Sequence, residues 1–198
     1  MQYKFPLFKS HLDLAHQYWE KLLKEGDWAI DATCGNGYDT LKLAEIVQVK
    51  EGGVIGIDIQ PEAIAKTAKL LQPWLSHVCL YCQSHEMFPP LADEKPIRLI
   101  VYNLGYLSRG DKRITTMTES TLTSVRNASE IVLPGGALSI SCYPGHKEGA
   151  REEQALLKEL NDWPSNMWNI CHHTFPNRPL APSLLFVQKR CIPCSDEN

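Results

Sequence analysis

A glycine-containing turn between an apolar run and a helical run constrains the fold of this 198-residue chain more than any other feature. The segment reads Asp31-Ala32-Thr33-Cys34-Gly35-Asn36-Gly37-Tyr38-Asp39-Thr40. An apolar run typical of a buried strand, residues 28–33, leads into it, and residues with helical spacing follow. Gly35 and Gly37 allow a tight turn and a close approach of a ligand to the backbone. A strand, a glycine turn and a helix in this order are typical of nucleotide sites in parallel α/β sheets.

Strand-like and helix-like runs alternate along the rest of the chain. We expect seven strands, near residues 28–33, 54–59, 78–81, 97–102, 137–141, 169–175 and 183–189. We expect helices near residues 10–25, after the glycine turn, and near 61–71, 116–131 and 152–160. This alternation predicts an α/β fold with a mostly parallel sheet and helices on both faces. No long helix separates the last two strands, so we expect an antiparallel terminal hairpin. The chain is expected to form one domain, residues 1–198, with residues 1–26 as an N-terminal helical cap.

Composition excludes several classes of protein. The net charge is −3, from 20 Lys and Arg against 23 Asp and Glu, so bulk charge does not hold this protein on nucleic acid. No apolar run approaches the roughly 20 residues of a membrane span, and we expect no secretory signal. Seven cysteines, an odd number, then favour reduced thiols in the cytoplasm. Two C-x-x-C pairs, Cys79-x-x-Cys82 and Cys191-x-x-Cys194, suggest a zinc site, but Cys79 and Cys82 would face opposite sides of a strand, so we expect no metal site.

The residues around the glycine turn indicate which nucleotide it binds. A dinucleotide site has a third glycine where this chain has Thr40. Asp31 and Asp39 flank the turn, and two carboxylates suit a positively charged ligand better than a pyrophosphate. S-adenosyl-L-methionine (SAM) carries an ammonium and a sulfonium, so it fits better than NAD. Asp58, at the end of the next strand, is expected beside the ribose. The alternative is a glycine turn that binds no ligand.

A second motif, Asn103-Leu104-Gly105-Tyr106, closes the strand near residues 97–102. It resembles the Asn/Asp-Pro-Pro-Tyr/Phe motif of amine N-methyltransferases. An Asn side-chain oxygen and the next backbone carbonyl can accept the N–H groups of an amine and orient its lone pair, and an aromatic ring can stack on a base.

Three histidines are further candidates. His146 can accept a proton or serve as an ordinary loop histidine, and both interpretations stay open. His11 and His16 are five residues apart and are expected on different faces of the first helix.

Four groups of residues together resemble one family. They are Asp31–Thr40, Ser84-His85-Glu86, Asn103–Tyr106 with Gly110-Asp111-Lys112, and Gly145-His146-x-x-Gly149. On these motifs, and over nearly its whole length, the chain is similar to a small bacterial family labelled rRNA methylases. The resemblance implies a Rossmann-like class I methyltransferase fold and SAM as the methyl donor. It also implies methylation of the aminomethyl group of 5-aminomethyl-2-thiouridine at the wobble position of tRNA.

The resemblance further implies the residues of the site. Asn103 and Tyr106 are expected at the methyl acceptor, with His146 as the third candidate catalytic residue. Ser84 and His85 fall where the family meets adenine. The donor site is expected to contain Asp31, Gly35, Asn36, Gly37, Asp39, Thr40, Asp58, Ile59, Ser84, His85 and Asn103.

Basic residues cluster in loops that we expect at the same edge of the sheet. Candidates for contact with the phosphates of a tRNA anticodon stem-loop are Arg109, Lys112, Arg113, Lys147 and Arg178. Ordinary solvated surface is the alternative. Two other functions stay open: a small-molecule amine or rRNA methyltransferase of the same fold, and a non-catalytic nucleotide- or metal-binding module. The sequence does not set the oligomeric state, and a homodimer stays open.

Overall fold

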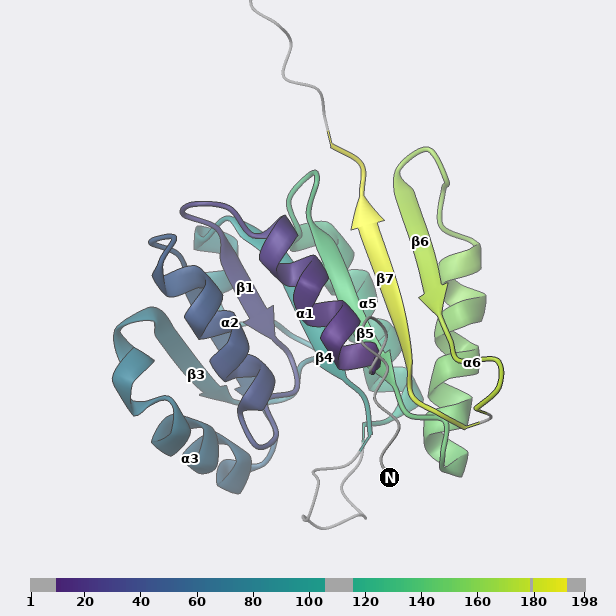
Figure 1. Ribbon diagram of the computed structural model, residues 1–198, viewed down its shortest axis with the longest axis horizontal. Helices are drawn as coiled ribbons and strands as arrows, with labels where there is room; N and C mark the ends of the chain where they lie inside the picture. Colours follow the sequence, from purple (N-terminus) through teal and green to yellow (C-terminus); the bar gives the residue numbers. More distant parts are fainter. Residues whose placement is uncertain (1–9, 106–115, 179, 192–198) are drawn as a thin grey trace, which may run out of the picture.

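A twisted sheet of seven strands forms the centre of the molecule, in the order β3-β2-β1-β4-β5-β7-β6 (Figure 1). The computed structural model describes residues 10–105, 116–178 and 180–191. The strands are β1 (Trp28–Asp31), β2 (Gly53–Asp58), β3 (Val78–Cys82), β4 (Ile97–Asn103), β5 (Ala137–Cys142), β6 (Trp168–His173) and β7 (Ser183–Lys189). β1 to β5 run parallel, β7 runs antiparallel to β5, and β6 runs antiparallel to β7. The predicted α/β sheet with an antiparallel terminal hairpin is confirmed.

Helices cover both faces of this sheet (Figure 1). They are α1 (His11–Leu22), α2 (Tyr38–Gln48), α3 (Pro61–Leu70), the 3₁₀ helix η1 (Gln72–His77), α4 (Leu91–Glu94), α5 (Thr118–Ile131) and α6 (Lys147–Asn161). α1 and α2 bury Trp19 and Leu43 against one face, whereas α5 and α6 bury Val125 and Leu156 against the other. Because the strands are covered on both sides, β1, β4 and β5 are almost entirely buried, which explains their continuous apolar sequences.

The N-terminal helix lies on a face of the sheet, where it contacts β4, β5 and β7. Ser10 caps α1, since its hydroxyl accepts a hydrogen bond from the N–H of Asp13 at 3.1 Å. Trp19 fixes the helix on β5 by donating its indole N–H to the hydroxyl of Ser139 at 2.9 Å. This placement brings the first turn of α1 to the carboxyl ends of the parallel strands.

Several element boundaries differ by two or more residues from those that the sequence predicts: α1 ends at Leu22 rather than near residue 25, β1 ends at Asp31 rather than near 33, and α5 begins at Thr118 rather than near 116. α6 begins at Lys147 rather than near residue 152, because His146 caps it: its Nδ1 accepts the N–H of Gly149 at 3.1 Å. β6 ends at His173 rather than near residue 175. The short elements α4 and η1 are too brief for a periodic apolar pattern, so the sequence contains no sign of them. In the described part of the chain, no helix has the length and apolar character needed to cross a membrane.

The strand order reverses between β1 and β4. β1 pairs with β2 on one side and with β4 on the other, so the chain crosses the sheet in opposite directions from this point. Ligands of open α/β sheets bind outside the carboxyl ends of the strands at such a switch point. These ends lie along the lower edge of the sheet in Figure 1.

Candidate active site

A cleft of about 830 Å³ opens at this switch point. Most of the residues expected in the site lie on its walls: Gly35, Asn36, Asp39, Asp58, Ile59, Ser84, His85, Asn103 and His146. Asp31, Gly37 and Thr40 are not among the lining residues and lie behind the wall of the cleft.

Asp58, at the end of β2, holds the glycine turn. Its Oδ2 accepts the N–H of Gly35 at 2.8 Å, and its Oδ1 accepts the N–H of Gln60 at 2.9 Å. A carboxylate oxygen has two lone pairs, so each oxygen keeps one acceptor site. Asp58 therefore fixes the turn and can still accept two hydroxyl groups, as the ribose of a nucleotide requires.

Asp31 and Thr40 brace the turn from inside. Asp31 is fully buried, and its Oδ2 accepts the hydroxyl of Thr40 at 2.6 Å while its Oδ1 accepts the N–H of Thr33 at 3.1 Å. Burial raises the pKa of this carboxyl to about 7. Gly37 has a φ of +83°, and a Cβ there would lie 2.9 Å from Oγ1 of Thr67 in α3. Thr40 thus stands where a dinucleotide site has its third glycine, and its hydrogen bond to Asp31 holds the helix on the strand in place of the close packing that a glycine allows.

The far wall of the cleft combines apolar surface with one unpaired polar atom. Ile59 follows Asp58 and is 61% exposed, which gives the cleft an apolar platform. The ring of His85 meets that of Tyr102 edge-on at 6.0 Å. Within the described residues, the buried Nδ1 of His85 has no hydrogen-bond partner, and burial lowers the pKa of the ring. A flat heterocycle such as adenine fits a wall that offers an apolar platform and one polar ring atom.

Asn103 ends β4 on the opposite wall, and three neighbours fix it. Its backbone N–H donates to the hydroxyl of Thr33 at 2.7 Å, and its Nδ2 donates to Oδ2 of Asp39 at 2.6 Å. The hydroxyl of Tyr143 lies 3.4 Å from its Oδ1. The side-chain oxygen of Asn103 therefore points away from Asp39, which leaves it available as an acceptor in the cleft.

The two histidines of α1 reach the same group of side chains. His16 Nε2 lies 2.8 Å from Oδ1 of Asp39, and His11 Nε2 lies 3.2 Å from the hydroxyl of Tyr143. The sequence places the two histidines on different faces of α1, yet both reach this group of side chains, because His11 is the first residue of the helix. Sequence reasoning missed Tyr143, although its place just after β5 marks the same edge of the sheet.

His146 closes the cleft beside the loop that follows β4. Gly105 has a φ of +127°, and a Cβ there would lie 3.6 Å from His146 Nε2. Gly149 leaves room for the same ring, since a Cβ at that position would lie 2.9 Å from Nε2. The Gly145-His146-x-x-Gly149 motif is thus a helix cap that also presents a histidine to the cleft.

The cleft is acidic. Four carboxylates line it, from Asp39, Asp58, Glu86 and Glu119, and no Lys or Arg lines it within the described residues. Such a lining attracts a cationic ligand and disfavours a pyrophosphate. The charge therefore agrees with the sequence-based preference for SAM over NAD.

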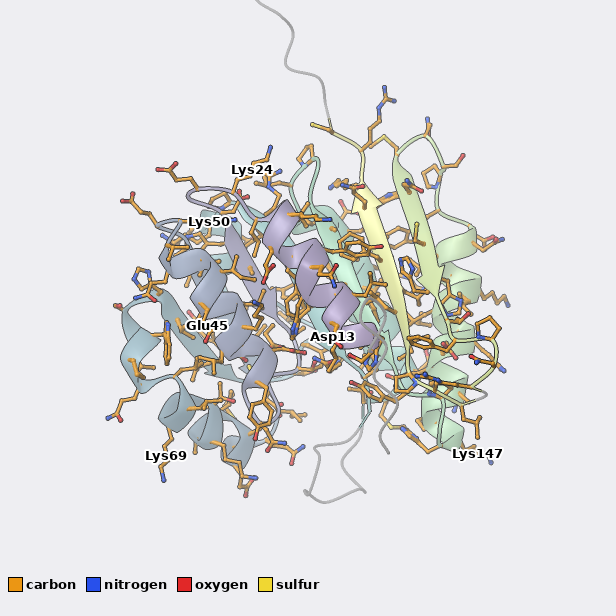
Figure 2. All side chains as sticks on the ribbon, in the orientation of Figure 1. Asp13, Lys24, Glu45, Lys50, Lys69 and Lys147 are labelled. Atoms are coloured by element: carbon orange, nitrogen blue, oxygen red, sulfur yellow. The ribbon has the colours of Figure 1, made fainter. Side chains whose placement is uncertain are left out.

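The predicted RNA contacts are only partly placed. The structure does not describe three of the predicted phosphate contacts, Arg109, Lys112 and Arg113. Tyr106, predicted at the methyl acceptor, also lies outside the described residues. Lys147 is exposed at the first turn of α6, and Arg178 is exposed with its guanidinium 5.1 Å from the ring centre of Phe175. Figure 2 shows Lys147 at the edge where the parallel strands end, whereas Lys24 and Lys50 lie at the opposite edge.

Comparison with known proteins identifies the family. The family model described as "Putative rRNA methylase" matches residues 54–189. The chain belongs to this family. It is 37% identical over 192 residues to the "tRNA (mnm(5)s(2)U34)-methyltransferase, chloroplastic" of Arabidopsis thaliana, covering 92% of this chain and 70% of that protein.

Two solved structures have the same architecture. The putative rRNA methylase of Clostridium thermocellum matches with a TM-score of 0.85 and 32% identity, over 96% of this chain and all of that one (100%). SMU.1697c, a putative methyltransferase of Streptococcus mutans solved with SAH, matches with a TM-score of 0.79 and 27% identity, over 92% and 99% of the two chains. The predicted Rossmann-like class I methyltransferase fold is confirmed, and the chain is a methyltransferase.

Proposed function

We propose that this protein transfers a methyl group from SAM to the aminomethyl group of 5-aminomethyl-2-thiouridine at the wobble position of tRNA. The observation that carries the proposal is the position of Asn103, whose side-chain oxygen faces the acidic cleft. Across the cleft lies the Asp58 wall, formed by Asp58, Ile59, Ser84 and His85. The name of the Arabidopsis relative, at 37% identity, supports the substrate. The complex of the Streptococcus mutans protein with SAH supports the donor.

The residues of the Asp58 wall fit SAM. Asp58 would accept the ribose hydroxyls, and the turn at Gly35 would lie against the methionine part. Ile59, Ser84 and His85 would meet adenine, where the unpaired Nδ1 of His85 supplies a polar partner. When bound, SAM supplies a methyl group on a positively charged sulfur, which makes that carbon electrophilic.

The residues of the Asn103 wall would hold the amine. A primary amine must be neutral to attack, and its lone pair must point at the methyl carbon. The Oδ1 of Asn103 would accept one N–H and so direct the lone pair, because an amide oxygen accepts but cannot donate. Tyr106 would stack on the base, and His146, at the cleft wall, would accept the proton released after transfer.

Basic residues around the cleft would hold the RNA. Arg109, Lys112, Arg113, Lys147 and Arg178 would contact phosphates of the anticodon stem-loop, while the modified base would enter the acidic cleft. Lys147 lies on the correct edge for this role (Figure 2). The proposal uses residues of one chain only. A tRNA substrate would fit the cytoplasmic location that the sequence predicts.

One alternative has an observation in its favour. The acidic lining of the cleft would also suit a small-molecule amine, which needs no phosphate contacts. Mass spectrometry of tRNA nucleosides from cells that lack this protein separates the two functions. Accumulation of 5-aminomethyl-2-thiouridine, reversed by the wild-type gene but not by Asn103→Ala, would support the tRNA function. An unchanged nucleoside profile would reject it and leave the small-molecule function.

A further inference from the structure

Five polar side chains form one hydrogen-bonded chain along the wall of the cleft that contains Asn103. They come from α1, α2, β4 and the loop after β5. His16 lies 2.8 Å from Asp39, and Asp39 accepts the amide N–H of Asn103 at 2.6 Å. Tyr143 lies 3.4 Å from the amide oxygen of Asn103, and His11 lies 3.2 Å from the hydroxyl of Tyr143. The hydrogen-bonded chain starts and ends on α1, so this helix takes part in the site although its side chains carry no known motif.

The chemistry of Asp39 fixes the direction of these hydrogen bonds. A carboxylate only accepts, so His16 must carry a proton on Nε2 and Asn103 must turn its NH₂ group toward Asp39. The amide oxygen of Asn103 then faces Tyr143 and the cleft. Without Asp39 the amide could rotate by 180° and present NH₂ to the cleft, where a donor would repel an amine N–H.

Asp39 is placed to hold the amide in this one orientation. It is 9% exposed, both of its carboxylate oxygens are occupied by side chains, and it belongs to the first turn of α2. His16 belongs to α1, which covers the same face of the sheet as α2, and the centre of its ring lies 4.7 Å from the ring centre of Trp19. Asp39 is therefore held by two helices at the point where it meets β4.

We propose that Asp39, held by His16, is a positioning residue: it binds the NH₂ group of the Asn103 amide, so that the amide oxygen points toward the amine that receives the methyl group. This inference rests on the proposed amine methylation. It assigns Asp39 to the acceptor wall, where its contribution is to the orientation of the amine and not to the affinity for the donor.

An exchange of the two side chains tests this role directly. In Asp39→Asn, two amides face each other, and the hydrogen bonds to His16 and Asn103 both persist only if an amide turns or the proton of His16 moves to Nδ1. In Asn103→Asp, two carboxylates meet at hydrogen-bond distance. In the double variant Asp39→Asn/Asn103→Asp, the new amide donates to the new carboxylate, keeps an oxygen for His16, and leaves a carboxylate oxygen in the cleft. Net charge is unchanged.

The measurement is single-turnover methyl transfer to tRNA that carries the aminomethyl group, with SAM affinity measured by calorimetry. Both single variants should slow transfer at least tenfold with SAM affinity changed less than threefold, and the double variant should recover at least tenfold over the slower single. A double variant no faster than either single, or singles at the wild-type rate, would overturn the inference. Wild-type protein without activity on this tRNA would instead reject the proposed function.

A second pair of variants keeps the test decisive if the double variant unfolds. His16→Gln retains an N–H that can reach Asp39, whereas His16→Leu has similar size and no donor. Neither variant keeps the packing of the imidazole on Trp19, so a purely structural role predicts equal effects. We expect transfer by His16→Leu to be at least fivefold slower than transfer by His16→Gln, at equal melting temperature. Equal rates would remove His16 from the positioning role.

Discussion

Gly105 and Thr116, which flank the segment 106–115, are joined by two hydrogen bonds. The N–H of Thr116 donates to the carbonyl of Gly105 at 2.9 Å, and the N–H of Gly105 donates to the hydroxyl of Thr116 at 2.7 Å. That hydroxyl in turn donates to Glu152 in α6 at 2.8 Å. The two residues on either side of the segment with the predicted substrate contacts are therefore bonded to each other, and Glu152 holds this junction.

Replacement of Glu152 should weaken both the fold and the acceptor side of the cleft. Glu152 is 1% exposed and also accepts the hydroxyl of Thr121 at 2.6 Å, and burial raises its pKa. Glu152→Ala leaves two hydroxyls without their acceptor, so the free energy of unfolding should fall by about 2–4 kcal/mol. Chemical denaturation measures this decrease. Gln154→Ala, on an exposed position of the same helix, is the control, and equal effects would exclude the anchoring role.

Asp31 should make the protein less stable as the pH rises from about 4 to 7. Its pKa in the folded protein is about 7 against a usual 3.8, so the folded state binds the proton more tightly than the unfolded chain. Stability from this group is complete below pH 4 and disappears between pH 4 and 7. Asp31→Asn keeps an acceptor for Thr40 and cannot ionise. Denaturation curves should show that the free energy of unfolding of Asp31→Asn, relative to that of wild type, increases by up to about 4 kcal/mol between pH 4 and 7. If this difference were the same at every pH, the shifted pKa of Asp31 would be contradicted.

The sequence predicts the fold well because its signals are local. Continuous apolar strands, the glycine turn and the missing helix before the last strand are each visible within about ten residues. The start of α6 is harder to predict because a histidine cap is a rarer signal than Ser, Thr, Asp or Asn. The hydrogen-bonded chain from His16 to Tyr143 could not be predicted, since it joins α1, α2, β4 and the loop after β5 across the fold.

Asp58 should contribute to donor affinity. If its two remaining acceptor sites hold the ribose hydroxyls, Asp58→Ala should weaken SAM binding by about 1–3 kcal/mol, the usual cost of leaving polar partners unpaired. Glu62→Ala removes the same charge from an exposed position at the start of α3 and should bind SAM normally. Calorimetry with both variants checks the prediction, and unchanged affinity in Asp58→Ala would remove Asp58 from the donor site.

The loop between Gly105 and Thr116 should account for much of the salt dependence of tRNA binding. Removal of one phosphate-binding side chain reduces the slope of log affinity against log salt by about 1. The triple variant Arg109→Ala/Lys112→Ala/Arg113→Ala should therefore show a shallower slope than wild type. A control removes three lysines: Lys24 and Lys50 at the opposite edge of the sheet (Figure 2), and Lys21 in the last turn of α1. If both variants gave the wild-type slope, the three loop residues would be ordinary solvated surface.

Asn103 should govern the rate of methyl transfer and not the binding of the donor. Its amide oxygen is held toward the cleft by the hydrogen bond from Nδ2 to Asp39, so it can orient the amine only in the complex with substrate. Asn103→Ala removes this acceptor, and misorientation of the lone pair should slow transfer about 10²-fold or more. Asn169→Ala, at an exposed position of β6, is the matched control. A single-turnover assay with saturating SAM and aminomethyl tRNA measures the rate. Transfer by Asn103→Ala at the wild-type rate would reject amine orientation by this motif, although the donor site at Asp58 could still stand.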